Sequence, residues 1–106
     1  MAIKVMRGDS YLIPIDIYQD GVPVTPSMVR EIEVSIGSSL QKYMSKGEVV
    51  ESSGTWYFRL TQEETFALED GAAVYVRVAY RGNPGDVIGA KSGTIIAVET
   101  GSSEVL

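Results

Sequence analysis

Apolar and polar residues alternate with a period of two along most of the chain. Ile32, Val34 and Ile36 alternate with polar residues, which is the clearest half-buried strand pattern in the sequence. The same alternation covers residues 13–17, 56–60 and 74–80, and shorter candidates are residues 2–6, 40–44, 48–51, 86–90 and 94–98. The pattern predicts β-strands that bury one face.

Turn residues separate these segments at intervals of roughly 8–12 residues, the spacing of an all-β sandwich or barrel. They are Asp20-Gly21, Ser52-Ser53-Gly54, Asp70-Gly71 and Gly82-Asn83-Pro84-Gly85. Each supplies a position for a positive φ or a corner fixed by proline. Pro14 has no N–H group, so we expect its strand to lie at a sheet edge or to bulge there.

Two short helical turns are predicted between the strands. Thr61 and Glu64 have the spacing of a capping box, in which each side chain binds the backbone N–H of the other residue. Phe66 and Leu68 would then fold onto the core. Thr25 followed by Pro26 predicts a second helical start.

These elements together predict an all-β fold, an immunoglobulin-like β-sandwich of seven to nine antiparallel strands with one or two short helical turns. A small β-barrel is the structural alternative. No linker or repeat divides the sequence, so we expect a single domain over residues 1–98. Residues 99–106 are rich in Gly, Ser and Glu and are predicted to form a flexible C-terminal tail.

Composition narrows the range of functions. The 106 residues include no histidine and no cysteine, which argues against the usual zinc sites, disulfides and His-dependent catalytic triads. A net charge of −5 makes nucleic acid or an anionic membrane a poor partner. The N-terminus has no signal-peptide pattern and no apolar run approaches a membrane span, so we expect synthesis in the cytoplasm.

Acidic residues offer two candidate sites, each with a simpler interpretation. Asp16, Asp20, Asp70 and Asp86 fall near predicted strand ends but lack the spacing of a calcium loop, so turn chemistry is favoured over a metal site. Glu63-Glu64 are neighbours on a helical turn and point apart, unlike the paired acids of a glycosidase.

No nucleophilic or phosphate-binding arrangement is recognisable either. Ser45-Lys46 and Lys91-Ser92 are adjacent in sequence, and adjacent strand residues point to opposite faces. We therefore predict that the chain is not an enzyme and needs no cofactor or metal. Arg7-Gly8-Asp9 matches the tripeptide that integrins bind, but a tight corner between the first two strands explains it better.

A stripe of tyrosine and arginine is the most informative surface feature. If residues 55–60 pair with residues 72–81, the outward positions carry one candidate interface, made of Tyr57, Arg59, Tyr75, Arg77 and Arg81. Tyr and Arg are enriched at binding hot spots. A protein interface, stacking of sugar rings and an ordinary solvated sheet face all remain possible. Trp56 is in phase with Phe58 and Leu60 and is predicted to lie in the core.

Several motifs resemble small structural proteins encoded by phages and prophages of Gram-positive bacteria. They are Arg7-Gly8-Asp9-Ser10 followed by an alternating strand, the run from Gly54 to Thr65, the Val74-Val76-Val78 strand and the segment Val87-Ile88-Gly89-Ala90-Lys91-Ser92. The resemblance covers residues 3–98, and such proteins are similar to the immunoglobulin-like N-terminal domain of baseplate upper proteins.

The resemblance implies a virion component of the tail, baseplate or neck that docks onto other virion proteins. A symmetric homo-oligomer would fit a tail ring. Baseplate upper proteins continue into a long receptor-binding region, whereas this sequence ends at Leu106, which favours an accessory subunit. The alternative function is a carbohydrate- or cell-surface-binding module.

Overall fold

A computed structural model describes residues 2–19, 21–82, 87–99 and 105–106. Strands account for most of the described chain: β1 Ala2–Met6, β2 Tyr11–Ile15, β3 Tyr18–Gln19, β4 Val22–Pro23, β5 Val29–Ile36, β6 Leu40–Tyr43, β7 Val49–Ser52, β8 Thr55–Leu60, β9 Ala73–Tyr80 and β10 Val87–Val98. Three short helical segments interrupt them: the 3₁₀ helices η1 (Pro26–Met28) and η2 (Met44–Lys46) and the α-helix α1 (Gln62–Ala67). The predicted all-β class is confirmed.

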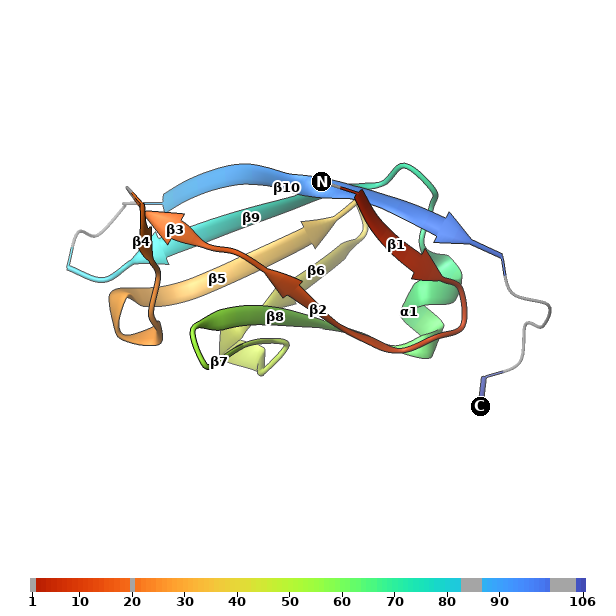
Figure 1. Cartoon of the computed structure of the whole chain (residues 1–106), viewed down its shortest axis with the longest axis horizontal. Coiled ribbons are helices and arrows are strands. Elements are labelled where there is room, and N and C mark those ends of the chain that lie inside the picture. Colours follow the sequence, from red (N-terminus) through yellow and green to blue (C-terminus); the bar gives the residue numbers. More distant parts are fainter. Residues whose placement is uncertain (1, 20, 83–86, 100–104) are drawn as a thin grey trace.

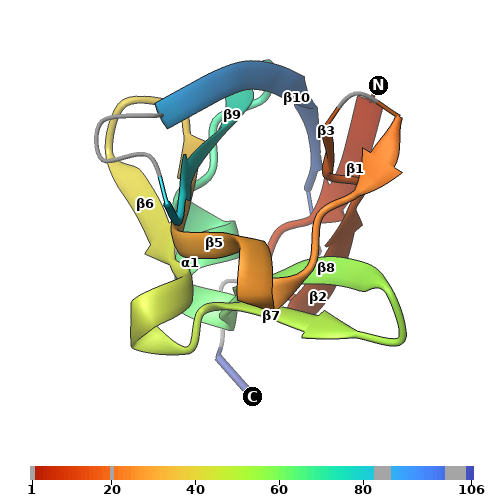
Figure 2. The same ribbon diagram turned by 90° about the vertical axis from the view of Figure 1, so that its left-hand side faces the viewer.

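The strands form two larger sheets that face each other across one core (Figures 1 and 2). A five-stranded sheet has the order β1-β10-β9-β5-β6, and a three-stranded sheet has the order β2-β8-β7. The strands β3 and β4 form a separate two-stranded ribbon. In the described part of the chain, no strand pairing joins the two larger sheets into a closed barrel.

The core is built by the inward positions of the alternating strands. Its largest fully buried side chains include Trp56 and Phe58 from β8, and Ile32, Val34 and Ile36 from β5. The alternation therefore predicted correctly which face of these strands is buried. The indole Nε1 of Trp56 donates a hydrogen bond of 2.8 Å to the carbonyl of Val24, so its one polar group is satisfied in the core.

Several sequence expectations about the strands were wrong in detail. Residues 86–90 and 94–98 were expected to form two strands, but β10 is one strand of 12 residues with a register shift between Lys91 and Gly93. A bulge explains this continuity, because it accommodates an extra residue without ending the strand. The described strands number ten rather than seven to nine, and β1 pairs with β10 in parallel, so the expected fully antiparallel arrangement was also wrong.

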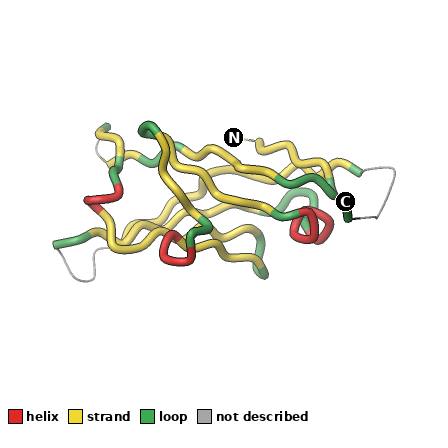
Figure 3. Tube along the Cα trace, turned by 90° about the horizontal axis from the view of Figure 1, so that it is seen from below, coloured by secondary structure: helices red, strands yellow, loops and turns green. Residues whose placement is uncertain are grey.

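The helical predictions were largely confirmed. Thr61 Oγ1 accepts from the N–H of Glu64 at 3.2 Å, and the N–H of Thr61 donates to Glu64 Oε1 at 2.8 Å, which is the predicted capping box. The second predicted helical start, at Thr25, is confirmed, because Thr25 is the N-cap of η1. Helix η2 was not predicted. All three segments lie at the periphery in Figure 3, and α1 lies at the end of the molecule that carries the last described residues.

Pro14 lies in β2, which is an edge of the three-stranded sheet, as predicted. Some expectations fall on residues outside the described part of the chain: Asp20 and Asp86, the turn at residues 83–85, and residues 100–104 of the tail.

Candidate functional site

The predicted stripe of tyrosine and arginine is divided between the two larger sheets. Strand β8, with Tyr57 and Arg59, pairs with β2 and β7, whereas β9, with Tyr75 and Arg77, pairs with β5 and β10. The premise that these two strands pair was therefore wrong. Because the two sheets face each other, their outer faces look in opposite directions (Figure 2). A single platform for stacking a sugar on Tyr57 and Tyr75 does not form.

The remaining members of the stripe have separate surroundings. Tyr57 is half-buried between Pro14 of β2 and Val50 of β7. Arg59 is exposed and lines a hollow of about 630 Å³ that also includes Leu12 and Leu106. Arg81 follows the end of β9, and its Nε donates to the carbonyl of Val29 at 2.7 Å, so this guanidinium is partly used to hold β5.

Tyr75 and Arg77 remain together on the outward surface of the five-stranded sheet, which we call the large-sheet face. The side chains of β9 alternate there with Val74 and Val78, which are buried on the inner side. Tyr75 is 47% exposed, and the side chain of Arg77 is 60% exposed. Both are therefore available to a partner.

Arg77 belongs to a polar row that crosses the large-sheet face from β6 to β9. Its Nε donates to Glu33 Oε1 at 2.8 Å, and the hydroxyl of Tyr43 donates to Glu33 Oε2 at 2.9 Å. Lys46 lies 4.9 Å from the centre of the Tyr43 ring, within cation–π range. Register produces the row, because Glu33 is directly opposite Arg77 on β9 and opposite Tyr43 on β6.

The row fixes the charge of its members. The hydrogen bond from Arg77 is the main reason that the pKa of Glu33 is lowered, and the Tyr43 hydroxyl adds to it against partial burial. The hydrogen bond to Glu33 in turn raises the pKa of Tyr43 and of Arg77. At neutral pH the row therefore holds a carboxylate, a neutral phenol and a guanidinium. The terminal nitrogens of Arg77 have no hydrogen-bond partner among the described residues, so they can donate to a carboxylate of a bound protein.

Gly89 of β10 helps to position Arg77, because the arginine side chain lies close to the glycine backbone. A Cβ atom at Gly89 of β10 would lie 3.1 Å from Cγ of Arg77, so the aliphatic stem of the arginine lies over the glycine. The sequence pattern did not predict Gly89, Glu33 and Tyr43 as parts of the site. Alternation does place Glu33 outward, but only the strand register shows which residues it faces.

A second cluster joins β6 to α1 and contains a buried charge. The side chain of Lys42 is only 4% exposed, and its Nζ lies 2.5 Å from Glu64 Oε2 and 3.8 Å from Glu48 Oε2. Burial opposes ionisation of Glu64, but hydrogen bonds from Lys42 and Thr61 outweigh it, so its pKa is lowered. The same glutamate thus caps α1 and neutralises Lys42.

Arg7-Gly8-Asp9 forms a packed corner between β1 and β2. Arg7 Nε and Nη2 donate to the carbonyl of Leu68 at 3.1 and 2.9 Å, and its Nη1 pairs with Glu99. The N–H of Gly8 donates to Thr65 Oγ1 at 3.0 Å, and that hydroxyl lies 2.7 Å from the carbonyl of Asp9. These contacts support the interpretation of the tripeptide as a structural corner.

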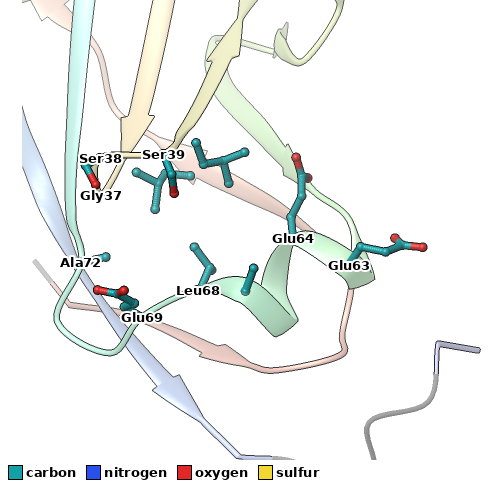
Figure 4. Close-up of a pocket in the computed structure, with 11 residues that line it drawn as sticks. Gly37, Ser38, Ser39, Glu63, Glu64, Leu68, Glu69 and Ala72 are labelled. Atoms are coloured by element: carbon teal, nitrogen blue, oxygen red, sulfur yellow. The ribbon is translucent and has the colours of Figure 1, made fainter.

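A cavity of about 320 Å³ lies beside α1, between this helix and the tip of the β5–β6 hairpin (Figure 4). Its apolar part is formed by Ile36, Leu40, Ala67, Leu68 and Ala72. Its polar part comes from Ser38 and Ser39 of the turn and from three glutamates, Glu63, Glu64 and Glu69.

Of the acidic residues expected near strand ends, Asp16 and Asp70 lie in the described part of the chain. Asp70 Oδ1 accepts from the N–H of Ala97 at 3.0 Å, which is a turn contact. The described residues contain no group of three or more acids placed to hold a metal ion. None of the helices in that part of the chain has the length and apolar character needed to cross a bilayer.

The chain was compared with known proteins. No protein-family profile matches it, and neither the curated proteins nor the solved structures include a match.

Proposed function

We propose that this chain is a non-enzymatic structural protein of a phage or prophage particle, an accessory subunit of the tail, baseplate or neck with an immunoglobulin-like sandwich. The sequence resemblance supports this role, and its motifs lie at junctions of the fold. Arg7 and Gly8 hold the β1–β2 corner against α1, and the run from Gly54 to Thr65 leads from β8 into that helix. Two sheets facing each other, with Trp56 between them, support the immunoglobulin-like assignment.

The observation that carries the proposal is the composition of the large-sheet face. Besides Arg77, its outward positions include four large apolar side chains that are 40–48% exposed: Met6, Tyr75, Val87 and Ile96. A face that combines exposed apolar residues with Tyr and Arg is typical of a protein interface. A neighbouring subunit would therefore bind the chain by covering this face.

Strand addition at β1 is a second way in which a neighbour can bind. The N–H of Arg7 bonds to Val98 of β10, and alternate residues of a parallel strand bond to the same side. The peptide groups of Lys4 therefore face the open edge, where an extended segment can pair with them. The edge at β2 is less suitable, because Pro14 provides no donor.

Purified particles test the proposal. After prophage induction of the source cell, peptide mass spectrometry should find this chain in particles at a fixed ratio to known tail proteins. The same ratio should persist through a second density gradient. If the chain is found only in the soluble lysate, the proposed virion role is wrong.

A further inference from the structure

The cavity beside α1 has a chemistry that the proposed interface does not use. Its floor is apolar, with Ile36 and Leu68 almost completely buried, and its volume of about 320 Å³ is at the lower end of the range for ligand sites. Among the described residues that line it, none is aromatic, so they offer no surface on which a sugar ring can stack. The floor instead suits an aliphatic chain.

The charges at the mouth of the cavity determine which polar group a bound ligand can carry at the end of its aliphatic chain. Glu64 is already neutralised by Lys42, and in Figure 4 the carboxylate of Glu63 points away from the cavity. Glu69 is exposed at the mouth and has no hydrogen bond or ion pair to its carboxylate among the described residues. An anionic occupant would meet this uncompensated carboxylate, whereas a cation would be attracted to it.

The hairpin tip completes the site. The N–H of Gly37 donates to the carbonyl of Ala73 at 2.9 Å, which fixes the tip against β9. The hydroxyls of Ser38 and Ser39, both exposed, have no hydrogen-bond partner among the described residues and can accept from a bound donor.

We propose that this cavity binds an arginine or lysine side chain of a partner protein, with the aliphatic stem on the apolar floor and the charged end at Glu69. Such a side chain matches both parts of the cavity, because it carries an alkyl stem and a cationic head. The net charge of −5 also favours a basic partner. This inference rests on the proposed function, since it specifies how a neighbouring subunit is recognised.

A peptide titration tests the site without a particle. The ¹⁵N-labelled full chain is titrated with the peptide acetyl-Leu-Arg-Leu-amide and, separately, with the same peptide carrying Gln or Glu in place of Arg. We expect chemical-shift changes at Gly37, Ser38 and Glu69 with the arginine peptide, and much smaller changes with the other two.

Two charge-reversal variants form a matched pair. Glu69→Lys should weaken binding of the arginine peptide about tenfold, since it replaces an attraction by a repulsion. Asp16→Lys changes the net charge equally at another exposed position and should leave binding within about twofold. Both variants should keep the melting temperature of the wild-type chain.

Three results would overturn the proposal: equal binding of all three peptides, shifts located away from the hairpin tip, or an equal loss of binding in both variants. Sedimentation of the free chain tests whether a second copy of the chain occupies the cavity. If the free chain forms a dimer that Glu69→Lys dissociates, the occupant is a second copy, and the proposal of a different, basic partner is wrong. The particle experiment needs neither peptide nor variant, so failure at this cavity and failure of the virion role are distinguishable.

Discussion

Substitution of Gly8 by alanine should destabilise the fold more than the same change at any glycine with open surroundings. Gly8 has a φ of +91°, and a Cβ atom there would lie 2.7 Å from Cζ and 3.0 Å from Cε1 of Phe66. A side chain at positive φ costs about 1–3 kcal/mol. Overpacking against the ring adds about 1–3 kcal/mol, because Phe66 packs beside a corner held by hydrogen bonds.

Gly54 provides the matched control. Its φ is +85°, and no atom of the described residues lies within 4 Å of a Cβ atom built there. Gly54→Ala should therefore show the backbone cost alone, about 1–3 kcal/mol, and Gly8→Ala should lose about 2–6 kcal/mol. That is a large fraction of the ~5–15 kcal/mol total stability of a small domain.

Urea unfolding, followed by circular dichroism, measures the loss in free energy of unfolding for Gly8→Ala and for Gly54→Ala. A third comparison tests whether the Phe66 ring causes the difference. In a Phe66→Ala background the clash is absent, so Gly8→Ala should cost no more than Gly54→Ala. If Gly8→Ala and Gly54→Ala cost the same in the wild-type background, the reasoning is refuted, because the ring would then yield freely and the corner would not depend on this contact.

Four further predictions concern the ion pair, the core and the large-sheet face. Glu64→Gln keeps the capping acceptor but leaves the Lys42 ammonium buried, so urea unfolding at pH 7 should show a loss of about 2–4 kcal/mol, whereas a loss equal to that of Glu63→Gln would contradict the pairing. The lowered pKa of Glu64 means that its stabilisation is complete above its ordinary value of 4.5 and is lost as the pH falls through the folded value, so a Glu64→Gln chain should show a flatter decline in stability from pH 5 to 3. Trp56→Phe removes the donor to Val24 and should cost about 1–3 kcal/mol, and an unchanged urea midpoint by circular dichroism would show that the buried carbonyl finds another partner. Arg77→Ala removes the hydrogen bond to Glu33, so it should lower the urea midpoint only slightly, as for an exposed ion pair, but it should reduce incorporation into particles. Normal incorporation would exclude Arg77 from the interface.

Local patterns predicted much of the fold because they depend on neighbouring residues. Alternation identified the buried faces of β5, β8 and β9, and the spacing of Thr61 and Glu64 identified the start of α1. The parallel pairing of β1 with β10 joins segments about 90 residues apart, and alternation carries no information about the partner strand.

The site was harder to predict for the same reason. Tyr57 and Tyr75 were correctly recognised as outward-facing but were placed on one surface, because the sheet to which each strand belongs is set by the whole topology. The burial of Lys42 was not foreseen either. Its position on the inner side of β6 is tolerable because Glu64 reaches it from a helix 22 residues away in sequence, with Glu48 as a more distant second partner.

Hydroxyl-radical footprinting of purified particles tests whether a neighbouring subunit covers the large-sheet face. Oxidation of Tyr75 is compared between the free chain and the chain in particles, with Tyr57 on the opposite outer face and Tyr18, 58% exposed in β3, as internal references. Tyr75 should be protected in the particle, whereas Tyr57 and Tyr18 should keep the oxidation rates of the free chain. Equal oxidation of Tyr75 in both states, or absence of the chain from the particles, would contradict the proposal that a neighbouring subunit covers this face.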